Sequence, residues 1–233
     1  MKSYLIIIPA FNEEENIERV LRDTTRSNPD AEILVVDDGS TDRTSAIAKR
    51  AGIRVMNIPF NIGYGGAIQT GFRFATDEGY DFVITMDGDA QHDPSSVGNL
   101  IETMKCDGAD VVIGSRFLGS PYSMSIARRV GIFIFSRIAK LYTGQTFTDP
   151  TSGFQLLKRE VFSYLAEGDN YPLDYPDVNI IMALHKKKFK VREAPVRMVE
   201  KPNGRSMHAG LRPFLYIARM LLAILMVLLR KED

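Results

Sequence analysis

Short apolar runs alternate with amphipathic stretches through the first 115 residues of this 233-residue chain. The runs are rich in β-branched residues and predict strands, and the stretches between them have the periodicity of helices. The predicted strands are 4–8, 33–36, 53–58, 82–86 and 111–114, and the predicted helices are 12–26, 42–51, 67–78 and 94–105. Regular alternation of this kind indicates an α/β fold, in which helices cover both faces of a parallel sheet.

The alternation changes after Gly114. Beyond it, the pattern predicts helices over 125–142 and 178–188, an extended strand over 191–199 and a loop over 201–210. Near the start of the chain, Asn12 and Glu15 have the spacing of a capping box. We therefore expect the first helix to begin at Asn12.

The last predicted element is an apolar helix over 214–229, interrupted by Arg219 and followed by Arg230 and Lys231. Its 16 residues fall short of the roughly 20 that a membrane-spanning helix needs. It is also too apolar on all sides for a surface helix in water. We therefore expect a globular domain over 1–210 and a membrane-interface or partner-binding helix over 211–233. The alternative is a last core helix packed on the sheet.

Composition narrows the class of protein. The single cysteine, Cys106, excludes an internal disulfide and a multi-cysteine zinc site, and it fits a reducing cytoplasm. Residues 1–100 carry 16 acidic and 9 basic side chains, whereas residues 185–233 carry 4 acidic and 12 basic ones. This asymmetry suggests a metal site in the first half and an anionic surface partner for the last part. No nucleic-acid recognition motif accompanies the basic residues, so we expect no nucleic-acid partner.

Two carboxylates follow the predicted strand 82–86 directly, in the sequence Asp87-Gly88-Asp89-Ala90-Gln91. In open α/β sheets, ligands bind beyond the carboxyl ends of the strands. Two carboxylates held close together need a cation, and oxygen ligands suit Mg²⁺ or Mn²⁺ and the phosphates that such ions carry. We therefore expect a metal-dependent site for a nucleotide diphosphate. The alternative is a loop in which Asp89 and Asp93 only cap the helix that starts at Pro94.

Four loops, each at the end of a predicted strand, resemble those of the family 2 glycosyltransferases. They are Pro9-Ala10-Phe11-Asn12-Glu13, Val36-Asp37-Asp38-Gly39-Ser40-Thr41-Asp42, Asp87-Gly88-Asp89 and Gly114-Ser115-Arg116. The resemblance covers roughly residues 3–200. A closer resemblance is to the dolichol-phosphate mannose synthase branch and its bacterial polyprenyl-phosphate relatives. It is carried by Asp89-Ala90-Gln91, Gly114-Ser115-Arg116-Phe117 and Thr151-Ser152-Gly153-Phe154.

The resemblance implies a Rossmann-like GT-A fold with a mostly parallel sheet, a divalent metal, a nucleotide-sugar donor and inversion at the anomeric carbon. It implies a nucleoside pocket lined by Pro9, Phe11, Glu13 and Asp38, with Asp87 near the ribose and the metal. It also implies that Asp89 and Gln91 coordinate the metal and that Arg116 meets the phosphates. Gly39 would let the backbone approach the ligand, and Asn61 and Gly63 either shape the same pocket or form a turn. Glu13 has the alternative role of a first-turn acid.

The acceptor decides which other side chains the reaction needs. A polyprenyl phosphate attacks through a phosphate oxygen that is mostly ionised at neutral pH, so it needs cations rather than a base. We assign Arg128 and Arg205 to the acceptor phosphate, the alternative being a solvated basic face. A hydroxyl acceptor would need a base, for which Asp174 and Asp177 are candidates. Their alternative role is to cap the helix that begins near Pro176.

We expect a peripheral enzyme on the cytoplasmic face of the cell membrane, which moves a sugar from a UDP- or GDP-sugar to a polyprenyl or dolichyl phosphate. Two alternatives stay open: transfer onto a saccharide hydroxyl in cell-envelope glycan synthesis, and a non-catalytic nucleotide-sugar-binding membrane scaffold. The C-terminal segment 211–233, called the tail below, would contact the membrane surface, a small membrane protein or a second copy of the chain. In the late loop, Arg205 stands where the synthase branch tends to have a first lysine, whereas Met207 cannot supply the second cation.

Overall fold

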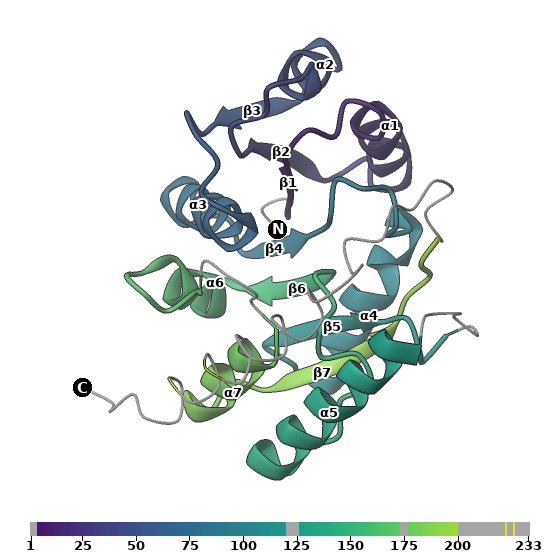
Figure 1. Cartoon of the computed structure of the whole chain (residues 1–233), viewed down its shortest axis with the longest axis vertical. Helices are drawn as coiled ribbons and strands as arrows, with labels where there is room; N and C mark the ends of the chain where they lie inside the picture. The colour runs from purple at the N-terminus through teal and green to yellow at the C-terminus, as the bar shows by residue number, and fades with distance from the viewer. Residues whose placement is uncertain (1–3, 120–125, 173–176, 200–221, 223–225, 227–233) are drawn as a thin grey trace.

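The computed structural model describes residues 4–119, 126–172, 177–199, 222 and 226. Within them the chain forms a seven-stranded sheet in the order β3-β2-β1-β4-β6-β5-β7 (Figure 1). The strands are β1 (Leu5–Ala10), β2 (Glu32–Asp37), β3 (Arg54–Asn57), β4 (Phe82–Thr85), β5 (Val111–Ser115), β6 (Gln155–Lys158) and β7 (Val191–Pro195). All neighbours pair in parallel except that β6 runs antiparallel to both β4 and β5. The predicted α/β fold with a mostly parallel sheet is confirmed.

Helices cover both faces of the sheet (Figure 1). They are α1 (Ile17–Ser27), α2 (Thr44–Arg50), α3 (Tyr64–Glu78), the 3₁₀ helix η1 (Pro94–Ser96), α4 (Val97–Asp107), α5 (Ile126–Thr143), α6 (Arg159–Ala166) and α7 (Val178–Lys186). One buried apolar cluster lies between the sheet and α3, α5, α6 and α7, and a second lies between the sheet and α1, α2 and α4. Alternate residues of β1, such as Ile7 and Ile8, enter opposite clusters. Strands buried on both faces appear in sequence as continuous apolar runs, which is why they could be predicted.

Two predicted boundaries were wrong by several residues, and two elements were missed. Helix α1 begins at Ile17 rather than at Asn12, because Asn12 adopts a left-handed conformation with φ of 55° and its side chain accepts the Thr41 N–H at 2.9 Å. The strand predicted over 191–199 ends at Pro195, and Met198 instead forms an isolated bridge with His92. Strand β6 and helix α6 were not predicted at all.

The predicted tail lies almost wholly outside the described residues. Leu222 and Met226 are the exceptions: both are helical and exposed. Across the described part of the chain, no helix combines the length and the apolar character that crossing a bilayer requires. The boundary near residue 210 remains a prediction.

Candidate active site

The candidate site residues that follow β1, β2, β4 and β5 lie at one edge of the sheet, where these strands end. Strand β6 contributes to the same edge from its other end, because it is antiparallel. Its first residue, Gln155, pairs with Thr85 of β4 and with Ile113 of β5. The segment that leads into β6, residues 148–154, therefore joins the loops that leave the parallel strands.

The Asp38 carboxylate fixes the loop that follows β3. Its Oδ1 accepts the Ile62 N–H at 2.8 Å, and its Oδ2 accepts the Gly63 N–H at 2.9 Å. Burial raises the pKa of Asp38, although these two hydrogen bonds favour the ionised form. Gly39 has φ of 73°, and a Cβ there would lie 2.8 Å from the Asn61 nitrogen. The structure thus brings together the residues predicted to shape the nucleoside pocket on this side, with Asp38 as the residue that orders them.

The end of β1 packs against the Asp-Gly-Asp turn. A Cβ on Gly88 would lie 3.1 Å from the Pro9 carbonyl oxygen and 3.7 Å from Cγ of Glu13. The Glu13 carboxylate accepts a hydrogen bond from the Asn16 side chain at 2.7 Å. Phe11 is exposed on the same loop. Pro9 and Glu13 therefore lie beside the turn that carries Asp87 and Asp89.

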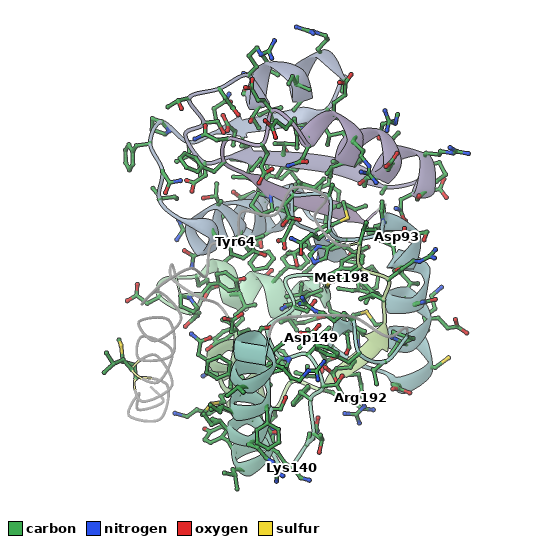
Figure 2. All side chains as sticks on the ribbon, turned by 45° about the vertical axis from the view of Figure 1, so that its right-hand side comes forward. Tyr64, Asp93, Lys140, Asp149, Arg192 and Met198 are labelled. Atoms are coloured by element: carbon green, nitrogen blue, oxygen red, sulfur yellow. The ribbon has the colours of Figure 1, made fainter. Side chains whose placement is uncertain are left out.

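The Asp87 carboxylate is contacted from several sides and remains 32% exposed. Tyr64, the first residue of α3, donates its hydroxyl to Oδ1 at 3.1 Å (Tyr64 is labelled in Figure 2). The Asp87 N–H donates to Nδ1 of His92 at 3.1 Å, and Nε2 of the same ring lies 3.6 Å from Oδ2. The His92 ring stacks on Phe154 with its centroid 5.0 Å away. His92 is thus a neighbour that orients Asp87.

Asp89 and Gln91 form a local pair in the same turn. The Gln91 backbone N–H donates to Oδ1 of Asp89 at 3.0 Å, and the Gln91 side-chain amide donates to Oδ2 at 2.8 Å. Asp93 accepts the Ser95 N–H at 2.9 Å and so caps η1. The capping alternative therefore describes Asp93 and not Asp89.

The donor set of the turn fits a hard divalent cation. Among the described residues, no three His, Cys, Asp or Glu side chains converge to hold a metal without further ligands. Magnesium-type sites that act on diphosphates need only one or two carboxylates, because substrate phosphates and water complete the shell. Asp87 and Asp89, with the carboxamide oxygen of Gln91, supply oxygen donors of that kind.

Tyr64 and Tyr171 lie within electrostatic reach of both Asp87 and Asp177. Desolvation of its hydroxyl and then the negative charge of Asp87 raise the pKa of Tyr64 well above its usual value, although the residue as a whole is 39% exposed. Burial and then the charges of Asp177 and Asp87 raise the pKa of Tyr171. Both phenols are therefore neutral donors at physiological pH. Asp177 occupies the N-cap position of α7, but its side chain makes no capping hydrogen bond, so the capping role considered for it is not realised.

Arg116, directly after β5, is buried against Asp149. Its Nε and its backbone N–H both donate to Oδ2 of Asp149, and the two residues are 4% and 0% exposed. Glu193 of β7 binds the same segment: it accepts the Asp149 N–H at 2.7 Å, and the N–H and hydroxyl of Thr148 at 2.7 and 3.0 Å. Burial raises the pKa of Glu193, against these hydrogen bonds. Sequence reasoning missed Asp149 and Glu193 as members of this group.

The two arginines assigned to the acceptor phosphate fall where no side chain is described. Arg128 belongs to the first turn of α5, and Arg205 lies within residues 200–221. Asp174, the other candidate base, is also outside the described residues. These three assignments therefore remain predictions.

A mostly parallel sheet with acidic loops at one edge is the architecture of a GT-A glycosyltransferase. The chain belongs to the family described as "Glycosyl transferase family 2", whose profile matches residues 5–165. It is therefore a glycosyltransferase, as predicted, and the non-catalytic alternative is set aside.

Several relatives place the chain within the family. The polyprenol monophosphomannose synthase of Mycolicibacterium smegmatis is 29% identical over 88% of this chain and 81% of its own length. The dolichol-phosphate mannosyltransferase of Pyrococcus furiosus is 32% identical over 91% of this chain and 61% of its own length. A solved structure, mannosyltransferase PcManGT from Pyrobaculum calidifontis in complex with GDP-Man and Mn²⁺, matches with a TM-score of 0.70 at 19% identity, over 99% of this chain and 65% of that one. The predicted resemblance in sequence and in fold is confirmed.

Proposed function

We propose that the enzyme moves a sugar from a UDP- or GDP-sugar to a polyprenyl or dolichyl phosphate, with inversion at the anomeric carbon and with Mg²⁺ or Mn²⁺ as the cofactor. The observation that carries the proposal is the Asp87-Gly88-Asp89 turn, which lies at the carboxyl end of β4 against the end of β1 and keeps Asp87 partly exposed. Relatives named for transfer to polyprenol and dolichol phosphates support the acceptor.

The donor would bind across the ends of β1, β2 and β4. Pro9, Phe11, Glu13, Gly39, Asn61 and Gly63 would line the nucleoside pocket, and Asp38 orders the loop that carries the last two. Asp87, Asp89 and Gln91 would hold the metal, which neutralises the diphosphate leaving group when bound. Tyr64 and His92 keep the Asp87 carboxylate in place.

The acceptor phosphate would attack from the opposite face of the sugar. A new bond forms between a phosphate oxygen and the anomeric carbon while the bond from that carbon to the diphosphate breaks, so the configuration inverts. The attacking oxygen is already ionised, and no protein base is required. Arg128 and Arg205 would bring the two anions together, because arginine binds phosphate in a two-pronged manner. Arg116, whose Nε is held by Asp149 and which is only 4% exposed, would join them through its terminal guanidinium nitrogens.

A second candidate is transfer to a saccharide hydroxyl, as in cell-envelope glycan synthesis. The observation that favours it is Asp177, whose carboxylate does not cap α7 and lies within electrostatic reach of Tyr64 and Tyr171. A carboxylate near the site is the base that such an acceptor needs.

The solvent-exposed face of α5 supports peripheral binding of the enzyme to a membrane surface. Val130, Phe133 and Leu141 expose 49%, 58% and 87% of their surface there. Exposed cations follow the same face, and the Arg137 guanidinium lies 5.1 Å from the Phe133 ring centroid. Helices that combine apolar and basic side chains in this way lie in lipid interfaces, where each cation contributes about 1 kcal/mol near an anionic leaflet. We place the enzyme on the cytoplasmic face of the cell membrane, with the tail on the lipid, on a small membrane protein or on a second copy.

The direct test is turnover with defined substrates. The purified protein is incubated with Mg²⁺ or Mn²⁺, undecaprenyl or dolichyl phosphate and a panel of UDP- and GDP-sugars, and both nucleoside diphosphate and glycolipid are measured. We expect release that requires lipid and metal and is lost in Asp89→Asn. Asp93→Asn is the matched control, because Asp93 lies in the same loop but only caps η1.

Donor binding without lipid-dependent turnover would refute the polyprenyl-phosphate acceptor. Turnover with saccharides that is then lost in Asp177→Asn would establish the hydroxyl acceptor instead.

A further inference from the structure

Residues 148–153 contact both charged groups of the proposed site. At one end, Asp149 accepts two hydrogen bonds from Arg116, through Nε and the backbone N–H. At the other end, a Cβ on Gly153 would lie 3.1 Å from Oδ1 of Asp87, and the Gly153 carbonyl accepts the Thr85 hydroxyl at 2.6 Å. The short segment 148–153 therefore lies between Arg116, which follows β5, and Asp87, which follows β4, and contacts both.

Glu193 fixes the start of this segment. Its two carboxylate oxygens accept three hydrogen bonds, all from Thr148 and Asp149. The Thr148 hydroxyl also lies 2.6 Å from the hydroxyl of Ser115, the residue before Arg116. Hydrogen bonds to an ionised acceptor are short and are the stronger class, so this contact orders the segment against both β7 and β5.

The position of Asp149 depends on Glu193, and the orientation of Arg116 depends on Asp149. Asp149, which is labelled in Figure 2, is fully buried, and a buried carboxylate is stable only while it keeps its partners. Its backbone is bound by Glu193, and its side chain binds the buried Arg116. Displacement of the Asp149 backbone would therefore displace the guanidinium.

We propose that Asp149 and Glu193 are positioning residues, which set the place of the Arg116 guanidinium relative to Asp87 and so define where a nucleotide diphosphate fits. This assignment rests on the proposed function, in which Arg116 meets phosphate and Asp87 meets the metal. Neither Asp149 nor Glu193 touches the substrate. They act through Arg116.

The first test measures the affinity for UDP and GDP with Mn²⁺ by calorimetry, together with the melting temperature. Glu193→Gln replaces one acceptor oxygen by an amide that cannot accept an N–H, so we expect roughly tenfold weaker nucleotide binding or more. Asp110→Asn is the matched control. Asp110 also accepts hydrogen bonds that tie β5 to its two neighbours, from Lys158 Nζ of β6 and from the N–H of Lys190, the residue before β7. It precedes β5 and so lies at the opposite end of that strand from Arg116. It should lower the melting temperature and leave the affinity unchanged.

A double-substituted background separates positioning from general loss of structure. Arg116→Met with Asp149→Leu removes both buried charges together, a replacement that cores tolerate better than loss of one partner. In this background Glu193→Gln should leave the nucleotide affinity within about twofold, because the arginine through which it acts is gone. Weakening by the same factor as in the wild type would overturn the proposal, as would wild-type affinity in Glu193→Gln alone.

A second readout does not need a nucleotide. The Nε–H signal of Arg116 in a nitrogen-15 NMR spectrum, identified by its absence from the double-substituted protein, should be protected from exchange in the wild type. It should shift in Glu193→Gln and not in Asp110→Asn, and an unshifted signal in Glu193→Gln would contradict the proposal. Failure of the wild type to bind any nucleoside diphosphate would count against the proposed function, whereas this signal reports on the positioning alone.

Discussion

Gly153 is the position at which the addition of one methyl group should disturb Asp87. A Cβ there would lie 2.6 Å from the Tyr64 hydroxyl and 3.1 Å from Oδ1 of Asp87. Real Cβ atoms do not approach an oxygen to 2.6 Å, so in Gly153→Ala the tyrosine must move. Its hydroxyl then leaves the 3.1 Å hydrogen bond to Asp87.

The size of the effect follows from these two contacts. Loss of a hydrogen bond to a charged acceptor costs about 1.5–3 kcal/mol, and overpacking typically costs about 1–3 kcal/mol. Because movement of Tyr64 relieves the clash by breaking the hydrogen bond, the two costs overlap, and we expect about 2 kcal/mol for Gly153→Ala. Tyr64→Phe alone loses only the hydrogen bond, which amounts to about 1.5 kcal/mol.

The double variant isolates the contact. Tyr64→Phe removes the atom that the new methyl group would strike, so Gly153→Ala should cost much less when Phe is already present. We therefore expect the double variant to be more stable than the sum of the single effects by about 1 kcal/mol or more. Urea unfolding followed by circular dichroism measures all four free energies of unfolding, and equal m-values would show that the unfolded states are comparable.

Additive effects would refute this interpretation. If the double variant equals the sum of the singles within about 0.5 kcal/mol, Tyr64 does not occupy the space beside Gly153 as described. Affinity for Mn²⁺ with nucleoside diphosphate gives a second check, because both single variants should weaken it while Asp93→Asn should not.

Three further predictions concern backbone, pH and metal. Gly39→Ala should cost about 3 kcal/mol in urea unfolding, because it combines a left-handed φ with a backbone contact at 2.7 Å, whereas Gly52→Ala, with φ of 76° and no neighbour within 4 Å, should cost only about 1–2 kcal/mol. Burial acts to raise the pKa of Asp110, but hydrogen bonds and the charges of two lysines lower it below its usual 3.8. Its contribution to stability is therefore present above that value and lost as the pH falls through the folded-state pKa, so melting temperatures of Asp110→Asn should depend less on pH below about 4. Chelation with EDTA should abolish sugar transfer, and Mn²⁺ should restore it.

The parts of the fold that could be predicted are those encoded by local pattern. Strands β1, β2, β4 and β5 are buried on both faces and appear as continuous apolar runs. Strand β6 is only four residues long, with polar residues at both ends, and it pairs with strands that are distant in sequence. Its existence depends on those partners, so no local signal marked it.

The candidate site also divides into residues that a local pattern marks and residues that depend on partners distant in sequence. Asp38, Asp87 and Asp89 could be chosen as candidates because each lies within three residues of the end of a predicted strand. Asp149 and Glu193 are joined by a hydrogen bond between residues 44 positions apart, which no spacing along the chain can indicate. Tyr64 carried a signal that could have been used, since a bulky phenol stands among glycines at the start of α3.

The antiparallel strand β6 also determines when, during synthesis of the chain, the sheet edge that carries the candidate site can be completed. Strands β3, β2, β1 and β4 pair with one another and are complete by residue 85. Strand β5 pairs only with β6 and β7, which follow it by about 40 residues or more. A nascent chain can therefore form the part of the edge that carries Asp38 and Asp87 early, but Arg116 gains Asp149 only after residues 148–158 have left the ribosome and entered the sheet. Sugar transfer should thus begin only once the second half of the domain has been synthesised.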